Sequence, residues 1–422
     1  MRLELSPTAP SGAIRSISSK SAAHRILICA AFADAQTVIR CDTVSRDIEA
    51  TAHCLRSLGA DIRYEAPYFT VTPVSAPVDM ARLNCHESGS TLRFLLPIIC
   101  ALGINAELCM AGRLPERPLS PLYEELAAHG ARLSPQGSNP LICQGKLSGD
   151  TFRIKGNVSS QYISGLLFAL TLMGGGELII EGALESAPYV DMTADALSLF
   201  GVSVKRTERG YSVPKGARPI SPLRTEVEGD WSNAAFPLCM AAVSGSSVTV
   251  TGLDPLSHQG DRQILNVLEQ MGAEVLQDGS SVTVTGRALH GIELDASQIP
   301  DTVPVIATVA AVSQGTTRIY GASRLRLKES DRLLALREAL CSLGADVRET
   351  DDGLIINGVS KLSGGEVQCF NDHRIAMSMA VAACASSGAI TLNGAECVSK
   401  SYPAFWKDMQ EKLSLEYKEL QH

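Results

Sequence analysis

The segment Leu268-Glu-Gln-Met-Gly-Ala-Glu-Val275 carries the pattern on which the whole chain is organised: a leucine, three residues, a glycine, a small residue, any residue and an aliphatic residue. Glycine is the usual stop of an amphipathic helix, and the aliphatic residue begins a strand. The pattern recurs at intervals of 71, 71, 71 and 72 residues, and its glycines are Gly59, Gly130, Gly201, Gly272 and Gly344. The chain is therefore about six copies of a unit of roughly 70 residues.

The unit is clearest between Asp261 and Gly321, and the next copy repeats it with a hairpin turn at Asp351-Asp352-Gly353. The sixth copy is degenerate, because its C-terminal run from Phe405 to Leu413 lacks the glycine. Two helices and four strands per unit predict an α/β protein in two halves of three units. The elements expected in the clearest copy are helices over 261–271 and 301–312 and strands over 273–276, 281–285, 292–294 and 316–320.

Length and composition limit the class of protein. A chain of 422 residues that is 45% hydrophobic can form two or three domains with full cores. The net charge of -8 argues against a nucleic-acid or membrane partner. The 12 cysteines are scattered and show no metal-ligand spacing, which predicts no metal site and a reduced compartment. The chain shows neither a signal peptide nor 18 consecutive apolar residues, so we expect a cytoplasmic protein.

The second helix of each unit begins with small, capping or polar residues. A helix N-terminus presents free N–H groups and a partial positive charge, so it can bind an anion. Taken singly, such residues only cap helices. Repeat symmetry, however, predicts that all six helix starts converge. The starts are Ser19-Lys20-Ser21, Ser88-Gly89-Ser90, Ser159-Ser160-Gln161, Gly229-Asp230-Trp231, Pro300-Asp301-Thr302 and Asp372-His373-Arg374.

Cations collect at or beside these helix starts. The densest group lies in Arg324–Arg332, before an apolar helix for which Ser330 and Asp331 are candidate capping residues. Such a stretch can also be a solvated, salt-bridged first turn. On an acidic protein, clustered Arg and Lys predict a pocket for a small, multiply anionic ligand. No Walker or dinucleotide motif is present, so we expect no cofactor. The cations are Lys20, Arg25, Arg93, Arg117, Lys328, Arg332, Arg374 and Lys400.

Taken in order, these motifs resemble those of the 5-enolpyruvylshikimate-3-phosphate (EPSP) synthase family and cover nearly the whole chain. The resemblance implies two domains of three βαβαββ units each, an inside-out α/β barrel around an interdomain cleft. We expect one domain at 14–224, binding mainly shikimate 3-phosphate. The other domain, 1–13 with 225–422, would carry much of the phosphoenolpyruvate site. The motifs are Ser19-Lys20-Ser21 with Arg25, Ser88–Arg93, Glu116-Arg117-Pro118, Ser159-Ser160-Gln161, Lys328–Arg332, Asp372–Met377 and Ser399–Pro403.

The reaction implied by the resemblance is transfer of the enolpyruvyl group of phosphoenolpyruvate to the 5-hydroxyl of shikimate 3-phosphate, with release of phosphate, on the route to chorismate. It proceeds by addition and elimination through a tetrahedral intermediate. The hydroxyl needs a base, the methylene carbon must accept a proton, and the anionic groups need cations. By resemblance, Asp301 accepts the hydroxyl proton, while Lys20 and Glu329 serve proton transfer at the enol carbon. From the residues alone, Asp301 could simply cap a helix after Pro300, or it could do both, and Glu329 could merely neutralise its cationic neighbours.

The resemblance also implies two sets of substrate-binding residues. We expect the protein to act as a monomer that closes its two domains around these substrates. The set for phosphoenolpyruvate is Lys20, Gly89, Arg117, Gln161, Arg332, Arg374 and Lys400. The set for shikimate 3-phosphate is Lys20, Ser21, Arg25, Ser159, Ser160, Gln161, Ser186, Asp301 and Lys328.

Several positions depart from the family pattern. Glu87 would add a negative charge beside the phosphoenolpyruvate site, and Arg324 could contact the sugar phosphate or face water. Trp231 and Asn233 interrupt the usual run of small residues. Gly89 has no side chain that would crowd an inhibitor, which favours sensitivity to glyphosate.

Two alternative functions remain from the sequence. A UDP-N-acetylglucosamine enolpyruvyl transferase would have a similar fold and the same donor, but the donor loop Gly112–Glu116 lacks the cysteine usual in that family. The second alternative is a non-catalytic protein that senses a phosphometabolite. Pure binding would not require the carboxylates of Asp301 and Glu329 in an anion pocket.

Overall fold

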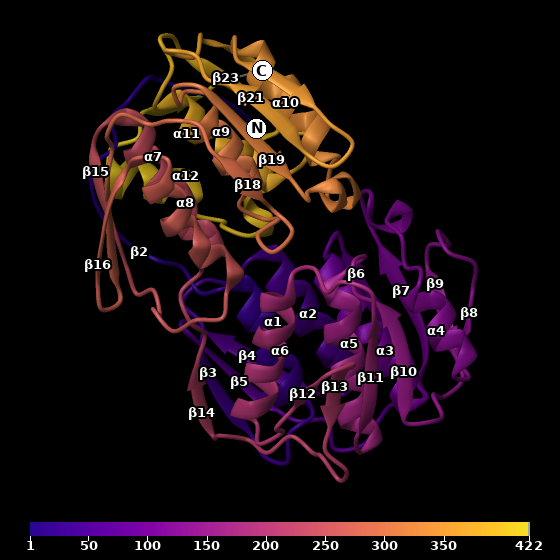
Figure 1. Ribbon diagram of the computed structural model, residues 1–422. Coiled ribbons are helices and arrows are strands. Elements are labelled where there is room, and N and C mark those ends of the chain that lie inside the picture. Colours follow the sequence, from indigo (N-terminus) through magenta and orange to yellow (C-terminus); the bar gives the residue numbers. More distant parts are fainter. Residues whose placement is uncertain (421–422) are drawn as a thin grey trace. The chain divides into compact units, whose positions relative to one another are not determined.

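The computed structural model describes residues 1–420, and its contacts divide the chain into two compact units (Figure 1). Unit 1 consists of Met1–Ile17 and the segment from Glu228 onward. Unit 2 is Ser18–Val227. Each unit contains three four-stranded sheets within the described residues.

The copy that begins in β18 shows how the repeat is built. Strand β18 (Glu293–Asp295) pairs in parallel with β19 (Thr316–Tyr320), and α9 (Val303–Ala310) connects them. Helix α10 (Arg332–Ser342) then leads into the antiparallel hairpin of β20 (Asp346–Glu349) and β21 (Leu354–Asn357). The order is βαβαββ, which confirms the expected repeat.

In the copy between Asp261 and Gly321, the helix and strand boundaries lie near their expected positions. The expected first helix begins as the 3-10 helix η2 (Gly260–Gln263) and continues as α8 (Ile264–Gln270). Strands β16 (Glu274–Asp278) and β17 (Ser281–Thr285) form the hairpin. The second helix starts two residues later than expected at 301, because the segment before Val303 forms a turn.

All six sheets have the same pairing, one parallel pair followed by two antiparallel pairs. The strand orders are β22-β23-β1-β24, β16-β17-β15-β2 and β18-β19-β21-β20 in unit 1, and β10-β11-β13-β12, β14-β3-β5-β4 and β6-β7-β9-β8 in unit 2. The remaining bounds in unit 2 are α1 (Lys20–Ala31), β3 (Thr37–Arg40), α2 (Arg46–Ser57), β4 (Asp61–Glu65), β5 (Tyr68–Thr72), β6 (Met80–His86), α3 (Gly89–Leu102), β7 (Asn105–Met110), η1 (Leu114–Glu116), α4 (Leu122–Ala128), β8 (Arg132–Leu133), β9 (Leu141–Gln144), β10 (Thr151–Lys155), α5 (Ser160–Met173), β11 (Gly176–Glu181), α6 (Ala187–Leu199), β12 (Lys205–Thr207) and β13 (Gly210–Val213).

Two strands mark the points where the chain passes from one unit to the other. β2 (Gly12–Arg15) precedes α1 of unit 2 but pairs with β15 (Ser247–Thr251) of unit 1. β14 (Arg224–Glu226) precedes the first long helix of unit 1 but pairs with β3 of unit 2. The units therefore change at Ile17–Ser18 and Val227–Glu228, a few residues after the expected positions 14 and 225.

The N-terminal strand completes the degenerate sixth copy. β1 (Arg2–Leu5) lies between β23 (Ile390–Asn393) and the C-terminal β24 (Tyr417–Glu419). The other bounds in unit 1 are α7 (Trp231–Ser244), η3 (Ser323–Leu327), β22 (Gly365–Gln368), α11 (His373–Ala383), η4 (Ala395–Lys400) and α12 (Phe405–Leu413).

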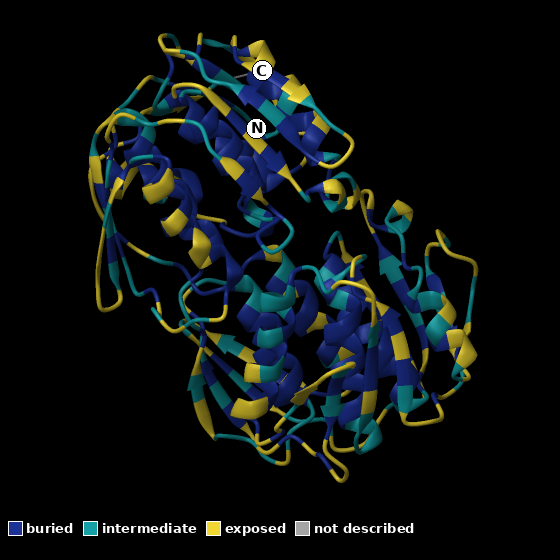
Figure 2. Ribbon diagram, in the orientation of Figure 1, coloured by how far each residue is buried: buried dark blue, intermediate teal, exposed yellow. Residues whose placement is uncertain are grey.

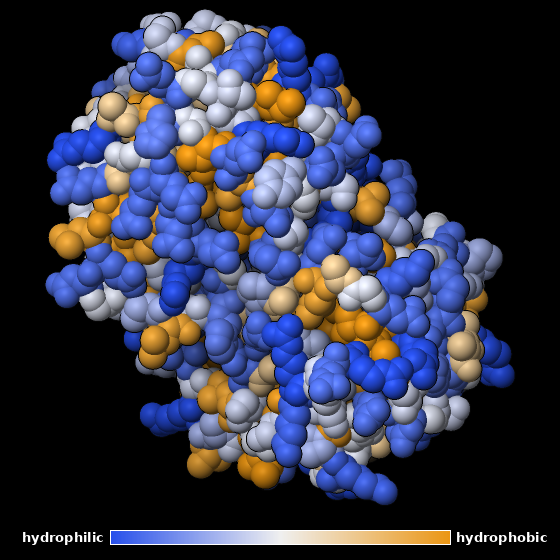
Figure 3. All heavy atoms as spheres, viewed as in Figure 1, coloured by the Kyte–Doolittle hydropathy of each residue, from blue (hydrophilic) through white to orange (hydrophobic). Residues whose placement is uncertain are grey.

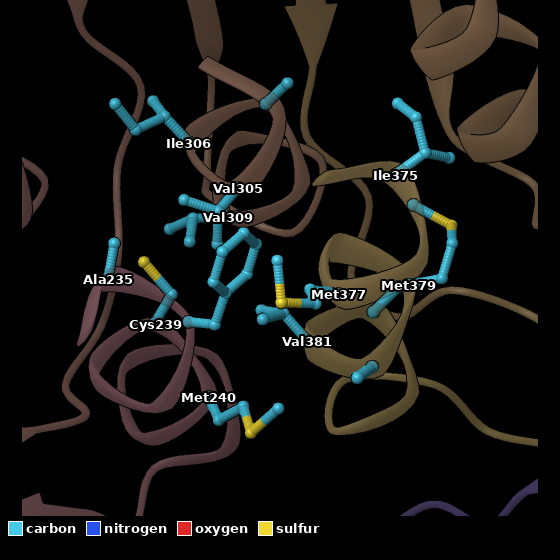
Figure 4. Close-up of a cluster of buried hydrophobic side chains, with 14 of the residues drawn as sticks. Ala235, Cys239, Met240, Val305, Ile306, Val309, Ile375, Met377, Met379 and Val381 are labelled. Atoms are coloured by element: carbon cyan, nitrogen blue, oxygen red, sulfur yellow. The ribbon is translucent and has the colours of Figure 1, made fainter. Parts of the chain in front are cut away.

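A helical core fills each unit, as the buried helices in Figure 2 show. In unit 1, helices α7, α9 and α11 pack together, and Cys239, Val309 and Met377 from the three helices contribute to one buried cluster (Figure 4). All three side chains are completely buried. Burying one large aliphatic side chain contributes about 1.5–3 kcal/mol, so this packing holds the helix starts in place.

Polar residues cover much of the face shown in Figure 3, where hydrophobic residues appear in separate groups. Exposed large hydrophobic side chains include Leu256 and Met80, which belong to different units. Within residues 1–420, no helix is both long enough and apolar enough to span a membrane.

Candidate active site

The three second helices of unit 2 begin with serine caps, as expected. Ser19 accepts a hydrogen bond from the backbone of Ala22, Ser88 from Thr91, and Ser159 from Gln161. These caps satisfy one donor each and leave other N–H groups of the first turns for a ligand. The three helices therefore have the local structure that an anion site requires.

Helices α3 and α5 are joined at their first turns by side chains. Gln161 donates to Ser90 Oγ over 2.9 Å, and its carbonyl oxygen accepts from Arg93 Nη1 over 3.1 Å. Arg93 is only 3% exposed and also donates to the carbonyl of Pro118. Gln161 is thus held in one orientation by two hydrogen bonds.

Gly89 faces two guanidinium groups. A Cβ atom at this position would lie 2.5 Å from Arg93 Nη1 and 3.0 Å from Arg117 Nη1. The absence of a side chain therefore leaves these cations next to the free N–H groups at the start of α3. Gly89, Arg93 and Arg117 together form a place where a phosphate or carboxylate group would be stabilised.

Helix α1 carries three more of the expected residues. Lys20 forms an ion pair with Asp47 of α2, 2.8 Å between Nζ and Oδ2, and both side chains are mostly buried. Arg25 donates to Thr193 Oγ1 and to the carbonyls of Ser21 and Tyr189 at 2.6–2.8 Å. Arg25 therefore fastens α1 to α6.

Ser186 and Ser160, two of the residues expected to bind substrate, lie at helix starts in unit 2. Ser186 is buried at the start of α6 and has a φ angle of 53°, which is uncommon for a residue other than glycine. Ser160 lies in the first turn of α5 and is 8% exposed. Strain of this kind at Ser186 persists only where the surrounding structure compensates for it.

In unit 1 the starts of α7, α9 and α11 also lie close together. Asp230 and Asp372 cap α7 and α11 with their side chains. Arg374 at the start of α11 donates to the carbonyl of Ser232 in α7 and lies 3.7 Å from Asp301, just before α9. The residue that directly precedes α9 is Thr302, whose side chain makes no capping hydrogen bond, and Asp301 lies one position earlier.

Arg332 is the centre of the polar residues in unit 1. Its side chain is 2% exposed and contacts three carboxylates: Asp372 at 2.8 Å, Glu329 at 2.8 Å and Asp301 at 3.0 Å. Burial alone would lower the pKa of Arg332, but the three carboxylates outweigh burial and raise it. A permanently charged group thus orders the carboxylates around it.

Lys328 precedes this helix and also contacts Asp301, with 3.4 Å between Nζ and Oδ1. Burial lowers the pKa of Lys328, an effect that Asp301 opposes and Arg332 reinforces. Lys328 lies outside α10, at the end of η3, so Lys328 and Arg332 do not share a helix face. Both nevertheless meet at the same carboxylate.

Lys400 approaches the start of α11 from η4. Its Nζ donates to the carbonyl of Asn371 over 2.6 Å, and the residue is 6% exposed. Phe370 and Asn371 both have φ angles of 51°, so two successive residues adopt a left-handed conformation there. The bond to Lys400 helps to hold this strained turn, which positions the cap of α11.

Comparison with known proteins identifies the family. Residues 6–409 match the family model described as EPSP synthase (3-phosphoshikimate 1-carboxyvinyltransferase). The chain belongs to the EPSP synthase family. A 3-phosphoshikimate 1-carboxyvinyltransferase of Clostridium perfringens (strain 13 / Type A) is 41% identical over 411 residues, with 96% of this chain and 97% of the relative covered. One of Methanocorpusculum labreanum is 39% identical, with 99% and 100% covered.

Solved structures agree with this family. An EPSP synthase from Acinetobacter baumannii has a TM-score of 0.81 and 25% identity, covering 99% of this chain and 100% of that chain. The enolpyruvyl transferase NikO from Streptomyces tendae has a TM-score of 0.76 at 20% identity, covers 99% of this chain and 98% of that chain, and supports the fold alone. The expected EPSP synthase fold and transferase class are therefore confirmed, and the alternative of a UDP-N-acetylglucosamine enolpyruvyl transferase is not favoured.

Two residues of this EPSP synthase family member were not assigned a site role from the sequence. Asp372 is completely buried and binds both Arg332 and Ser330, and Asp47 pairs with Lys20. In the sequence, the position of Asp372 at a helix start predicted a capping residue but not a contact with Arg332. Ser330, a candidate cap, donates to Asp372 instead, and Asp331 alone caps α10.

Trp231, Arg324 and Glu87, which depart from the family pattern, all have defined contacts in the structure. Trp231 is completely buried, and its indole nitrogen donates to the carbonyl of Asp254. Arg324 donates to the carbonyl of Ser297 over 2.7 Å. The carboxylate of Glu87 lies against Gly112, where an added Cβ would be 2.6 Å from its oxygen. Trp231 therefore contributes to the core of unit 1.

Proposed function

We propose that the polar residues of both units carry out the reaction of the EPSP synthase family on one pair of substrates, phosphoenolpyruvate and shikimate 3-phosphate. The observation that supports this most directly is the environment of Asp301. Its carboxylate contacts Lys328, Arg332 and Arg374, so a proton acceptor is surrounded by groups that bind anions. A binding protein for anions would gain nothing from a carboxylate at this position.

In the addition step, the 5-hydroxyl oxygen of shikimate 3-phosphate bonds to C2 of phosphoenolpyruvate. Asp301 accepts the hydroxyl proton, and the methylene carbon receives a proton from Lys20 or Glu329. In the elimination step the methyl group returns a proton to the group that supplied it, the C–O bond to phosphate breaks, and inorganic phosphate leaves with the hydroxyl proton that Asp301 had accepted. Arg332 holds Glu329 at 2.8 Å and Asp301 at 3.0 Å, which keeps two proton-transfer groups in fixed positions.

Phosphoenolpyruvate is assigned to anion-binding residues of both units. In unit 2 these are Lys20, the start of α3 at Gly89 with Arg117, and Gln161. In unit 1 they are Arg332, Arg374 and Lys400. Arginine forks suit a carboxylate and a phosphate better than single ammonium groups do, because they can donate two parallel hydrogen bonds.

Shikimate 3-phosphate is assigned to residues near the starts of α1, α5 and α6, to Asp301 before α9 and to the segment before α10. The serines offer hydroxyl donors and acceptors to the ring, and Arg25 and Lys328 supply charge for the phosphate. The 12 cysteines are free, which supports a reducing, cytoplasmic location as part of the proposal. The assigned residues are Lys20, Ser21, Arg25, Ser159, Ser160, Gln161, Ser186, Asp301 and Lys328.

The function is tested by phosphate release from phosphoenolpyruvate with shikimate 3-phosphate, with UDP-N-acetylglucosamine, and with neither. Release only with shikimate 3-phosphate is expected. Release only with the nucleotide sugar would contradict the acceptor assignment. Binding of phosphoenolpyruvate without release would indicate a sensor.

Gly89→Ala is expected to raise the KM for phosphoenolpyruvate by about tenfold, because the new methyl group would press on Arg93 and Arg117 and weaken roughly one charged hydrogen bond. Alanine is a better helix former than glycine, so the melting temperature should not fall. Steady-state kinetics measure the effect. Gly365→Ala, in β22 of unit 1, is the control and should leave this KM unchanged; an unchanged KM in Gly89→Ala would contradict the assignment of Gly89.

The charge of Lys328 predicts that the KM for shikimate 3-phosphate depends on pH. Because burial lowers its pKa, Lys328 loses its proton at a lower pH than an ordinary lysine, whose pKa is about 10.4. The KM for shikimate 3-phosphate should therefore rise with pH on the alkaline side. Lys328→Arg should move this rise to higher pH, since a guanidinium keeps its proton. Lys361→Arg, an exposed substitution, is the control; identical pH profiles for all three proteins would exclude Lys328 as the phosphate ligand.

A further inference from the structure

Four buried side chains of unit 2 form a continuous hydrogen-bonded chain across helices α1, α2 and α3. His24 Nδ1 lies 2.7 Å from Thr51 Oγ1, which lies 2.7 Å from Thr91 Oγ1. Thr91 in turn donates to Ser88 Oγ over 2.7 Å. All four residues are completely buried, and we call them the polar chain.

The polar chain has one consistent direction. Because Thr91 donates to Ser88, its oxygen is available to accept from Thr51, and the oxygen of Thr51 can accept from an Nδ1–H group of His24. This arrangement needs a hydrogen on Nδ1, which the Nδ1–H tautomer of the neutral imidazole supplies. Burial lowers the pKa of His24 well below its usual value, and the nearby charges of Lys20 and Arg25 lower it further.

Core packing alone does not explain the polar chain. Nε2 of His24 is buried and has no hydrogen-bond partner within the described residues. A half-satisfied imidazole costs stability that an apolar side chain of similar size would not cost. The histidine is therefore better explained by what its Nδ1 atom connects.

The polar chain connects two helix starts that the proposed function assigns to phosphoenolpyruvate. His24 lies one turn after Lys20 on α1, and Ser88 is the cap that precedes Gly89 on α3. Arg25, the next residue on α1, donates hydrogen bonds to Thr193 and Tyr189 of α6, and its guanidinium also lies over the ring of Phe94 in α3. The hydrogen bonds of α1 therefore run toward α2 and α3 through His24 and toward α6 through Arg25.

We propose that His24, Thr51 and Thr91 are positioning residues that hold the first turn of α3 against α1 and so set the distance between Lys20 and Gly89. They touch neither substrate. Lys20 belongs to both substrate sets, but Gly89 belongs only to the phosphoenolpyruvate set, and the hydrogen bonds of Arg25 to α6 do not pass through the polar chain. The polar chain therefore controls binding of phosphoenolpyruvate more strongly than binding of shikimate 3-phosphate. This inference rests on the assignment of Lys20 and Gly89 to phosphoenolpyruvate.

Thr51→Val and Thr91→Val test the proposal, since valine keeps the shape of threonine and removes the hydroxyl group. Each should raise the KM for phosphoenolpyruvate about three- to tenfold, the effect of losing one hydrogen bond. The KM for shikimate 3-phosphate should change less than about twofold. Thr51→Ser should restore the original value. The double variant should resemble the more severe single variant, because both break the same chain.

The matched control is Thr171→Val in α5. Thr171 is also buried, but among residues 1–420 its hydroxyl bonds only to the carbonyl of Leu167 within its own helix, 2.8 Å away. Both KM values of this variant should equal those of the unaltered protein. Melting temperatures of all variants separate loss of folded protein from loss of affinity.

Three results would overturn the proposal: an unchanged KM for phosphoenolpyruvate in Thr51→Val, an equal rise in both KM values, or a fall in kcat alone that follows the folded fraction. Failure of the proposed function would look different, because the unaltered protein would release no phosphate. The same variants would then be compared by the rise in melting temperature that phosphoenolpyruvate alone produces. An equal rise in the unaltered protein and Thr51→Val would likewise overturn the proposal.

Discussion

Asp301→Asn is expected to lower kcat for phosphate release by about 10²–10⁴-fold, the usual contribution of a general base. The amide keeps the shape of the carboxylate but cannot accept the hydroxyl proton. The side chain of Asp301 is 20% exposed, and its cationic neighbours have other partners, since Arg332 also binds Glu329 and Asp372. Binding of phosphoenolpyruvate should therefore survive.

The measurement is single-turnover phosphate release, with substrate binding followed separately. Asp295→Asn is the control, because Asp295 is exposed at the end of β18 and bonds through Oδ1 to the backbone of Ser297. This variant should keep full activity. If Asp301→Asn retained more than about a tenth of the original kcat, the base would have to be another group.

Arg332→Met is expected to destabilise unit 1 by about 3–5 kcal/mol, because it leaves the completely buried Asp372 without its charged partner. Turnover should be lost even in the folded fraction, since Asp301 and Glu329 lose the group that orders them. Urea unfolding followed by tryptophan fluorescence measures the first effect. Both tryptophans, Trp231 and Trp406, are buried in unit 1, so the signal reports on that unit.

Arg337→Met is the control on the same helix. Arg337 is 41% exposed and pairs with Glu349, so its loss should cost less than about 1 kcal/mol. Adding Asp372→Asn to Arg332→Met should restore part of the stability, because it removes the unpaired buried charge. Equal unfolding free energies for Arg332→Met and Arg337→Met would show that the buried cluster does not stabilise the unit.

Local signals in the sequence account for most of the elements. The hairpin at Asp278-Gly279, the helix caps Ser19 and Ser88 and the helix stop before Gly272 depend on residues within a few positions of one another. Their periodicity and capping chemistry are therefore visible without a structure. The cations expected near the helix starts could be found for the same reason.

Connections between distant residues could not be found in this way. The pairing of β2 with β15 and of β14 with β3 joins segments more than 180 residues apart, and the repeat pattern gives no sign of it. Asp372 caps α11 as its position predicted, but its bond to Arg332, 40 residues away, exists only after α10 and α11 pack. Sequence spacing alone could not show whether Asp301 caps a helix or pairs with Lys328 and Arg332.

By itself, the sequence determined the sixfold repeat, the helix starts and the residue types that meet there, because these depend on short-range periodicity and on the chemistry of each side chain. Tertiary structure alone decided which carboxylate pairs with which cation and that His24, Thr51 and Thr91 join three helices. Such contacts depend on how buried side chains pack in three dimensions, and burial makes each pairing strong enough to matter.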